Sequence, residues 1–123
     1  MSLLSRIGHP PFMARAYAIV LVGALLAGSA VSIGSPASAA PKTHVVTIEN
    51  LRFTPDVLTV QRGDRVVWIN KDLFAHTATA VSKAFDSHNI EPNASWTYVA
   101  RNPGEYAYVC ALHPTMKARL TVL

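Results

Sequence analysis

The chain has 123 residues, of which 50% are hydrophobic and 15% are charged, with a net charge of +4 and a single cysteine. This length provides material for one folded domain and leaves no room for a second. A single cysteine excludes an internal disulfide, and the basic residues are too scattered to form a stripe that would bind nucleic acid.

The first 39 residues have the features of a secretory signal peptide. They contain no Asp or Glu, and Arg6 and Arg15 precede an apolar run over 16–33 that is followed by the small residues Ala37-Ser38-Ala39. We predict cleavage after Ala39 and export to the periplasm or beyond. The alternative is an uncleaved anchor, because the run approaches the roughly 20 apolar residues of a spanning helix. Membrane association is expected only in that case.

Cleavage leaves residues 40–123, a domain of 84 residues (123 less 39). Its net charge falls from +4 to +2 because Arg6 and Arg15 leave with the signal peptide. We expect this domain to fold alone as a monomer. A bound metal would help to stabilise so small a core, since binding to the folded state adds to the folding free energy.

Short segments rich in β-branched and aromatic residues recur along the mature chain, separated by turns with Pro, Gly and Asn. In chain order, the expected strands cover 44–49, 56–60, 65–70, a run within 76–81, 95–99, 105–110 and 117–123. Apolar residues on both faces place 65–70 at the centre of a sheet, whereas 83–93 has loop composition with at most one short strand. The pattern predicts an all-β Greek-key β-sandwich of about seven or eight strands.

Five aromatic side chains lie in these strands, and we assign them to the core: Trp68, Trp96, Tyr98, Tyr106 and Tyr108. Tyr106 follows the Asn102-Pro103-Gly104 turn, so we expect it to brace that turn in the manner of a tyrosine corner.

One loop between the last two strands concentrates metal-binding chemistry. Cys110, His113 and Met116 follow each other at C-x2-H-x2-M spacing, which brings a thiolate, an imidazole and a thioether together locally. Thiolate and thioether ligands select copper, and a second imidazole would complete a trigonal His2Cys set with a weak axial Met. Zinc suits the set less well, because structural zinc sites use Cys and His.

The second imidazole must come from outside the loop. We predict His76, because it opens a strand after the turn-rich segment 70–72, and that position can bring it to the same end of the sandwich. His44 begins the first strand beside a frayed tail, and His88 lies in a hydrophilic loop. We interpret both as surface histidines.

Several segments resemble the cupredoxins, and among them the amicyanin-like and plastocyanin-like group. The matching segments are Phe53-Thr54-Pro55, Gly63-Asp64, Trp68-Ile69-Asn70, His76-Thr77, Phe85-Asp86-Ser87 and 103–110, together with the C-x2-H-x2-M loop with Pro114 after its histidine. The resemblance implies an eight-strand sandwich with one copper ion at one end. It makes His76 and His113 the equatorial imidazoles, Cys110 the thiolate and Met116 the axial thioether.

The sequence departs from the family pattern at a few positions. Ala118, His88 and Asn93 stand where relatives often have glycine, and Thr77 stands where plastocyanin-like relatives have an asparagine that tethers the cysteine loop.

The function that the resemblance implies is reversible one-electron transfer between transient redox partners, with a dehydrogenase or a cytochrome as the family analogy. His113, flanked by Leu112 and Pro114, would be the electron port. A copper carrier or storage protein is the alternative, and an interaction module with an accidental loop is a third reading. Catalysis by Cys110 with His113 is disfavoured, because a sandwich this small leaves little room for a substrate pocket. We therefore expect no enzyme.

Overall fold

The computed structural model describes Gly28 and residues 31–123. The chain divides into two units, and the second, Pro36–Leu123, holds every strand of the described part. Most of the predicted signal peptide lies outside the described residues, so its cleavage after Ala39 stays a prediction. Among the described residues, no helix is long and apolar enough to cross a bilayer.

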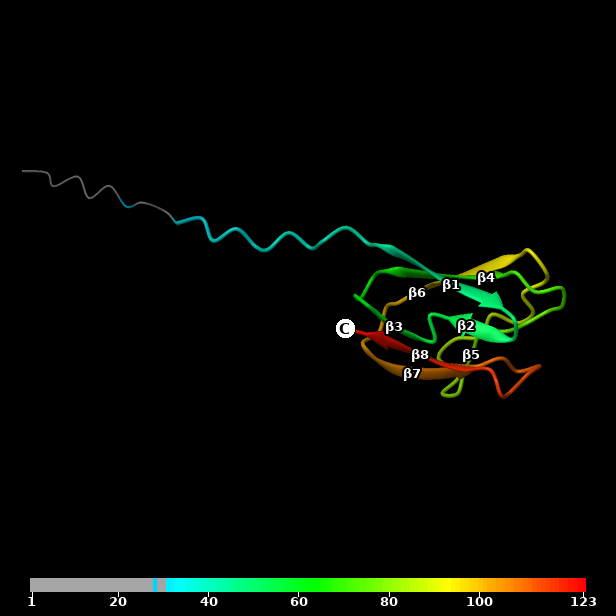
Figure 1. Cartoon of the computed structure of the whole chain (residues 1–123). Coiled ribbons are helices and arrows are strands. Elements are labelled where there is room, and N and C mark those ends of the chain that lie inside the picture. The colour runs from blue at the N-terminus through cyan, green and yellow to red at the C-terminus, as the bar shows by residue number, and fades with distance from the viewer. Residues whose placement is uncertain (1–27, 29–30) are drawn as a thin grey trace, which may run out of the picture. The chain divides into compact units, whose positions relative to one another are not determined.

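Eight strands build the second unit. Their bounds are β1 (Thr43–Glu49), β2 (Arg52–Thr54), β3 (Val57–Val60), β4 (Arg65–Asn70), β5 (Thr79–Ala80), β6 (Ser95–Val99), β7 (Gly104–Val109) and β8 (Lys117–Val122). The strands form two four-stranded sheets, in the orders β2-β1-β4-β6 and β3-β8-β7-β5. Figure 1 shows the two sheets as layers facing each other. The predicted all-β sandwich is confirmed.

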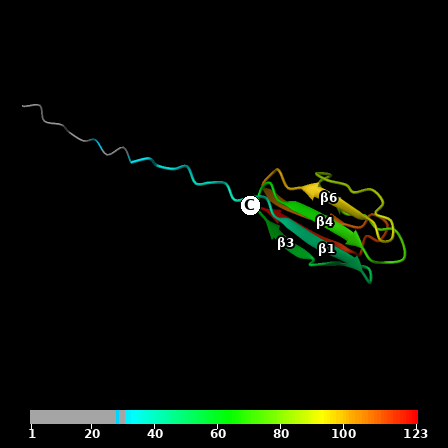
Figure 2. The same ribbon diagram turned by 90° about the horizontal axis from the view of Figure 1, so that it is seen from above.

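Both sheets are mixed. β1 pairs with β4 in parallel and β4 pairs with β6 antiparallel, an arrangement that can be followed from above in Figure 2. In the other sheet, β3 pairs with β8 in parallel and β7 pairs with β8 antiparallel. β4 therefore lies inside its sheet, as its apolar residues on both faces predicted.

The alternation of buried and exposed side chains along the strands determines which residues form the core. Val46 and Ile48 of β1 are fully buried, and so are Val66 and Trp68 of β4. Because successive side chains of a strand point to opposite faces, residues two apart share the inner face. These two adjacent strands thus present one continuous apolar surface to the second sheet.

An aromatic cluster fills the space between the sheets. Trp68 and Tyr108 are 0% and 1% exposed, their rings pack edge to face at 5.6 Å, and the indole nitrogen donates a 3.3 Å hydrogen bond to the phenol oxygen. Burial raises the pKa of Tyr108 to about 12. Trp96, Tyr98 and Tyr106 pack against this cluster from partly buried positions, which confirms the core assignment of all five.

Tyr106 also makes the predicted brace. Its hydroxyl donates a 2.7 Å hydrogen bond to the carbonyl of Asn102, four residues upstream. Gly104, between them, has a φ of 149°. Side chains other than glycine rarely adopt that conformation, so the turn requires the residue found there.

The structure differs from the sequence prediction around residue 52. The segment between the expected strands 44–49 and 56–60 contains β2, which pairs antiparallel with β1. The chain reverses at Asn50 and Leu51, both with positive φ (54° and 58°). A leucine in that conformation is uncommon, so sequence alone did not indicate the tight reversal. Positive φ also occurs at His88 and Asn93, a conformation that glycine adopts most readily.

The end of the sandwich where β1 begins is held by Asp64. Its carboxylate accepts hydrogen bonds from the backbone nitrogens of Lys42 (2.8 Å) and Gln61 (3.0 Å) and contacts His44 Nε2 at 2.8 Å. The backbone hydrogen bond from Lys42, followed by the hydrogen bond to His44, lowers the pKa of Asp64 to about 2. His44 is therefore a half-buried structural partner, and the prediction of a solvated surface histidine was wrong.

Candidate metal centre

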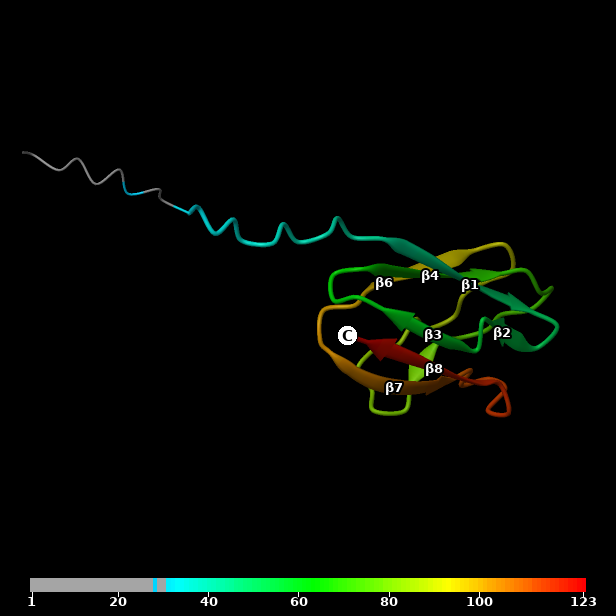
Figure 3. The same cartoon turned by 60° about the vertical axis from the view of Figure 1, so that its left-hand side comes forward.

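The loop from Cys110 to Met116 connects β7 to β8 at the end of the sandwich away from the C-terminus (Figures 1 and 3). Its own backbone closes it. Cys110 N donates to the Met116 carbonyl at 3.1 Å, His113 N donates to the Cys110 carbonyl at 3.2 Å, and Met116 N donates to the His113 carbonyl at 2.9 Å. These bonds fold the seven residues into a tight turn, so the three predicted ligands of the loop are held close to β7 and β8.

His76 reaches the same end from the segment between β4 and β5. Its backbone exchanges two hydrogen bonds with Ile90, at 3.2 and 2.7 Å, in an isolated bridge rather than a strand. The predicted strand at or just after His76 is reduced to the two residues of β5. The imidazole is 0% exposed, which fixes its position in the interior.

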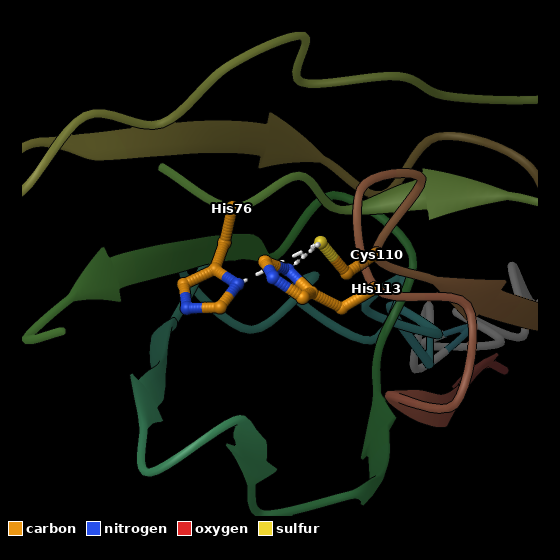
Figure 4. A group of neighbouring side chains, drawn as sticks. All are labelled: His76, Cys110 and His113. Carbon is orange, nitrogen blue, oxygen red and sulfur yellow. Dashed lines mark hydrogen bonds between the residues drawn. The ribbon is translucent and has the colours of Figure 1, made fainter. Parts of the chain in front are cut away.

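His76, Cys110 and His113 converge in space. Figure 4 shows the Cys110 sulfur facing both rings, and Sγ lies 3.7 Å from Nδ1 of His76 and 3.7 Å from Nδ1 of His113. One ligand atom from each residue lies within 4.8 Å of the other two. A metal ion bound at about 2.3 Å to sulfur and about 2.0 Å to nitrogen would separate those atoms by about 3.7 Å in a trigonal arrangement. The observed spacing therefore fits a metal.

Met116 belongs to the same region. Its side chain is 4% exposed and packs in the hydrophobic core cluster that also contains Cys110. Its backbone pairs with that of Cys110, as described above, so the two residues lie side by side at the base of the loop. The axial role of Met116 stays a prediction.

The other two histidines of the mature chain lie elsewhere. His44 pairs with Asp64 at the start of β1, and His88 has a side chain that is 88% exposed. Neither belongs to the cluster of possible metal ligands found among the described residues. His88 is thus a surface histidine, as expected.

A carboxylate that the sequence reasoning missed orients His76. Nε2 of His76 lies 2.7 Å from Oδ2 of Asp72, and the same carboxylate accepts hydrogen bonds from the backbone nitrogens of Asn50 (2.8 Å) and Leu51 (3.1 Å). Burial acts to raise the pKa of Asp72, but the hydrogen bonds from Leu51, Asn50 and His76 outweigh it and lower the pKa. The spacing of four residues between the carboxylate and the histidine was the available signal.

Thr77 fastens the cysteine to the same segment. Its backbone nitrogen donates to Cys110 Sγ at 3.3 Å, and its hydroxyl accepts a 2.7 Å hydrogen bond from the backbone nitrogen of Ala111. A threonine hydroxyl thus holds the cysteine loop.

The surface above the site is apolar. Leu73, Phe74 and Leu112 are 91%, 46% and 51% exposed, and Pro114 is exposed beside His113. The Phe74 ring lies 5.6 Å from that of His113 and 5.1 Å from that of His76, measured between centroids. We call these four residues the apolar face. Sequence reasoning identified Leu112 and Pro114 but not Phe74 or its chain neighbour Leu73, because the approach of Phe74 to His113 depends on tertiary packing.

Comparisons with known proteins agree with this geometry. The family model described as a cupredoxin-like domain matches residues 17–122. Amicyanin of Paracoccus denitrificans is 27% identical, over 81% of this chain and 82% of the relative. A Synechococcus plastocyanin is 28% identical, over 77% of this chain and 82% of the relative. The fold, the site and the family match together show that the chain belongs to the cupredoxin-like domain family.

Solved structures give the same result. A Cu(I) form of an amicyanin variant superposes with a TM-score of 0.63 at 26% identity, over 71% of this chain and 88% of that one. A copper-containing nitrite reductase from Thermus scotoductus has a TM-score of 0.61 at 27% identity, but the match covers only 25% of the enzyme chain. Copper is the metal that this family and the donor set of His76, Cys110 and His113 imply.

Proposed function

We propose that this protein is an exported type 1 (blue) copper protein that carries single electrons between redox partners. The observation that carries the proposal is the equal 3.7 Å separation of one buried sulfur, Cys110 Sγ, from two imidazole nitrogens. His76, Cys110 and His113 would hold the ion, with Met116 as the axial ligand. Bound copper would supply a reversible one-electron couple.

The protein part of the site is suited to fast electron exchange because it is fixed in advance. Hydrogen bonds hold His76 through Asp72 and Cys110 through Thr77, and the sandwich anchors both segments. A ligand set that moves little between two oxidation states needs little reorganisation when an electron arrives. The protein contributes this rigidity and also shields His76 and Cys110 from water.

The burial of two proposed ligands favours an electron carrier over an enzyme. His76 and Cys110 are 0% exposed, whereas His113 is partly exposed beneath the apolar face. A substrate could not reach the first two ligands, but an electron can leave through the His113 ring. The nitrite reductase likeness covers a quarter of that enzyme, which fits a shared domain rather than a shared reaction.

The location and the partners complete the proposal. We infer cleavage after Ala39 and residence in the periplasm. The strands of the described part begin at Thr43, so removal of residues 1–39 would leave every one of them intact. The mature protein would act as a monomer and meet a dehydrogenase or a cytochrome transiently, as the family analogy suggests. The apolar face is the surface through which it would dock.

A visible spectrum tests the proposal directly. The protein is expressed with its own leader, purified from the exported fraction and loaded with Cu(II), and its N-terminus is read by mass spectrometry. We expect an intense thiolate-to-copper band, lost in Cys110→Ser and retained in His88→Ala, and a chain that begins at Ala40. Colourless binding of Cu(I) alone would support copper carriage or storage instead. Absence of copper binding would contradict both.

A further inference from the structure

A row of hydroxyl groups leads from the cysteine loop to a surface carboxylate. The backbone nitrogen of Ala111 donates to Thr77 Oγ1 at 2.7 Å, and that oxygen lies 2.8 Å from Thr79 Oγ1. Thr79 Oγ1 in turn donates to Asp86 Oδ1 at 3.2 Å. The row passes from the buried Thr77 through the half-buried Thr79 to the exposed Asp86.

The chemistry of the two ends fixes the direction of every bond in the row. A backbone N–H can only donate and an ionised carboxylate can only accept, while each hydroxyl has one hydrogen to give. The Thr79 hydrogen goes to Asp86, so Thr79 must accept from Thr77. Thr77 thereby uses its hydrogen on Thr79 and offers a lone pair to Ala111. Each bond polarises the next in the same sense.

The backbone around the row keeps its members in place. Thr79 and Asp86 face each other in an antiparallel bridge, and the neighbouring backbone adds hydrogen bonds from Ala80 N to the Phe85 carbonyl (2.9 Å) and from Ser87 N to the Ala78 carbonyl (3.1 Å). The backbone nitrogen of His88 also donates to Asp86 Oδ1 at 2.8 Å. The carboxylate is therefore oriented rather than free to rotate.

We propose that Thr77, Thr79 and Asp86 act as one polarised hydrogen-bond chain that positions Cys110 for copper, with Asp86 as its remote positioning residue. The proposal rests on the blue-copper function proposed above. A hydroxyl at position 77 needs an acceptor for its own hydrogen if its lone pair is to stay aimed at Ala111. Thr79 and Asp86 supply that acceptor, which extends the control of the cysteine loop to a charge on the protein surface.

Amide hydrogen exchange at Ala111 in the metal-free protein tests the chain independently of copper. Removing the acceptor in Thr77→Val should speed exchange at Ala111 by about fivefold or more, since one hydrogen bond is lost. Thr77→Ser keeps the hydroxyl and should restore protection. Thr79→Val and Asp86→Asn should give smaller increases. Thr97→Val, at an exposed threonine of β6, and Glu105→Gln, at an exposed carboxylate of β7, are the matched controls and should change nothing.

Measurements of copper affinity and reduction potential then test whether the hydrogen-bond chain positions Cys110 for copper. Thr77→Val should weaken Cu(II) binding by about 10- to 100-fold, the range found when a supporting partner of a metal ligand is lost. Thr79→Val should weaken it by about threefold, because it alters the bond only through polarisation. In the Thr77→Val background, Thr79→Val and Asp86→Asn should have no further effect on affinity or potential, since both act through the missing hydroxyl.

Two results would overturn the proposal. One is exchange at Ala111 in Thr79→Val and Asp86→Asn equal to that of the two controls. The other is an effect of Thr79→Val that persists at full size in the Thr77→Val background. Asp86→Asn lies on the surface, so it keeps the test decisive if a buried variant fails to fold. A wild-type protein without the blue band would refute the proposed function. The exchange rates at Ala111 would still show whether the hydrogen-bond chain exists.

Discussion

The imidazole of His76 donates its Nε2 proton to the Asp72 carboxylate across 2.7 Å. The direction follows from the carboxylate, because an ionised carboxylate can only accept a hydrogen bond; the other ring nitrogen, Nδ1, faces Cys110 Sγ. A carboxylate partner makes the imidazole a stronger donor toward the metal and fixes the ring orientation. Asp72 is itself held by two backbone nitrogens, so hydrogen bonds of the protein alone fix the orientation of both side chains.

Replacing Asp72 should therefore weaken copper binding and raise the reduction potential. In Asp72→Ala we expect a loss of Cu(II) affinity of about 10- to 100-fold. Removing a negatively charged partner should weaken the binding of Cu(II) more than that of Cu(I), because Cu(II) carries the higher charge. Each tenfold difference between the two losses of affinity raises the reduction potential by about 59 mV. Titration with Cu(II) and Cu(I) chelators and direct voltammetry measure both effects.

The control for Asp72→Ala is Glu105→Gln, which removes one negative charge from an exposed position of β7. It should leave affinity and potential close to wild type. A potential in Asp72→Ala that equals the wild-type value would show that the carboxylate does not influence the metal.

Asp64 should make the fold sensitive to acid. Its folded-state pKa, lowered to about 2 by the backbone of Lys42 and then His44, lies below the ordinary value of 3.8. The stabilisation is therefore fully present above pH 3.8 and is lost as the pH falls toward 2. Asp64→Asn should have a lower free energy of unfolding than wild type at pH 7, and the difference should shrink through this window. Urea titrations at several pH values provide the measurement, and an equal gap at pH 7 and pH 2 would contradict it.

Copper should stabilise the folded state by mass action. With free copper at roughly 1,000 times the dissociation constant, the gain is about 4.1 kcal/mol. For a domain of this size, that corresponds to a rise in melting temperature of about 15 °C or more. Calorimetry with and without Cu(II) measures it. Cys110→Ser, which removes the thiolate, should show a much smaller rise, and an unchanged melt of the wild type would argue against a site specific to the folded state.

Electron exchange through the apolar face should depend weakly on salt. The face of Leu73, Phe74, Leu112 and Pro114 carries no charge, and the mature chain has a net charge of only +2. We expect the self-exchange rate between oxidised and reduced copies, measured by NMR line broadening, to change by less than about threefold between low and physiological ionic strength. Leu112→Lys should slow it by about tenfold at low salt and make it rise with salt. A steep salt dependence in the wild type would place the contact elsewhere.

Much of this protein can be predicted from neighbouring residues alone. Segments rich in β-branched and aromatic residues, bounded by turn residues, identified every strand of the described part except β2, and apolar residues on both faces placed β4 in the interior of its sheet. The C-x2-H-x2-M spacing placed Cys110, His113 and Met116 in one loop, because ligands so close in sequence need no long-range folding to meet. The position of His76 after a turn-rich segment was enough to select it over His44 and His88, and the structure brings it to Cys110.

The contacts that set the site's properties were decided only by the tertiary structure. The hydrogen bonds of Asp72 to Asn50 and Leu51, and of Thr77 to Ala111, join residues 21 to 34 positions apart. They exist because β1 and β4 pair in one sheet and β5 and β7 pair in the other. Hydrophobic alternation marks which face of a strand is buried, but it carries no information on which distant polar side chain will meet a given donor. That depends on the register of the sheets, which forms only when the whole sandwich packs.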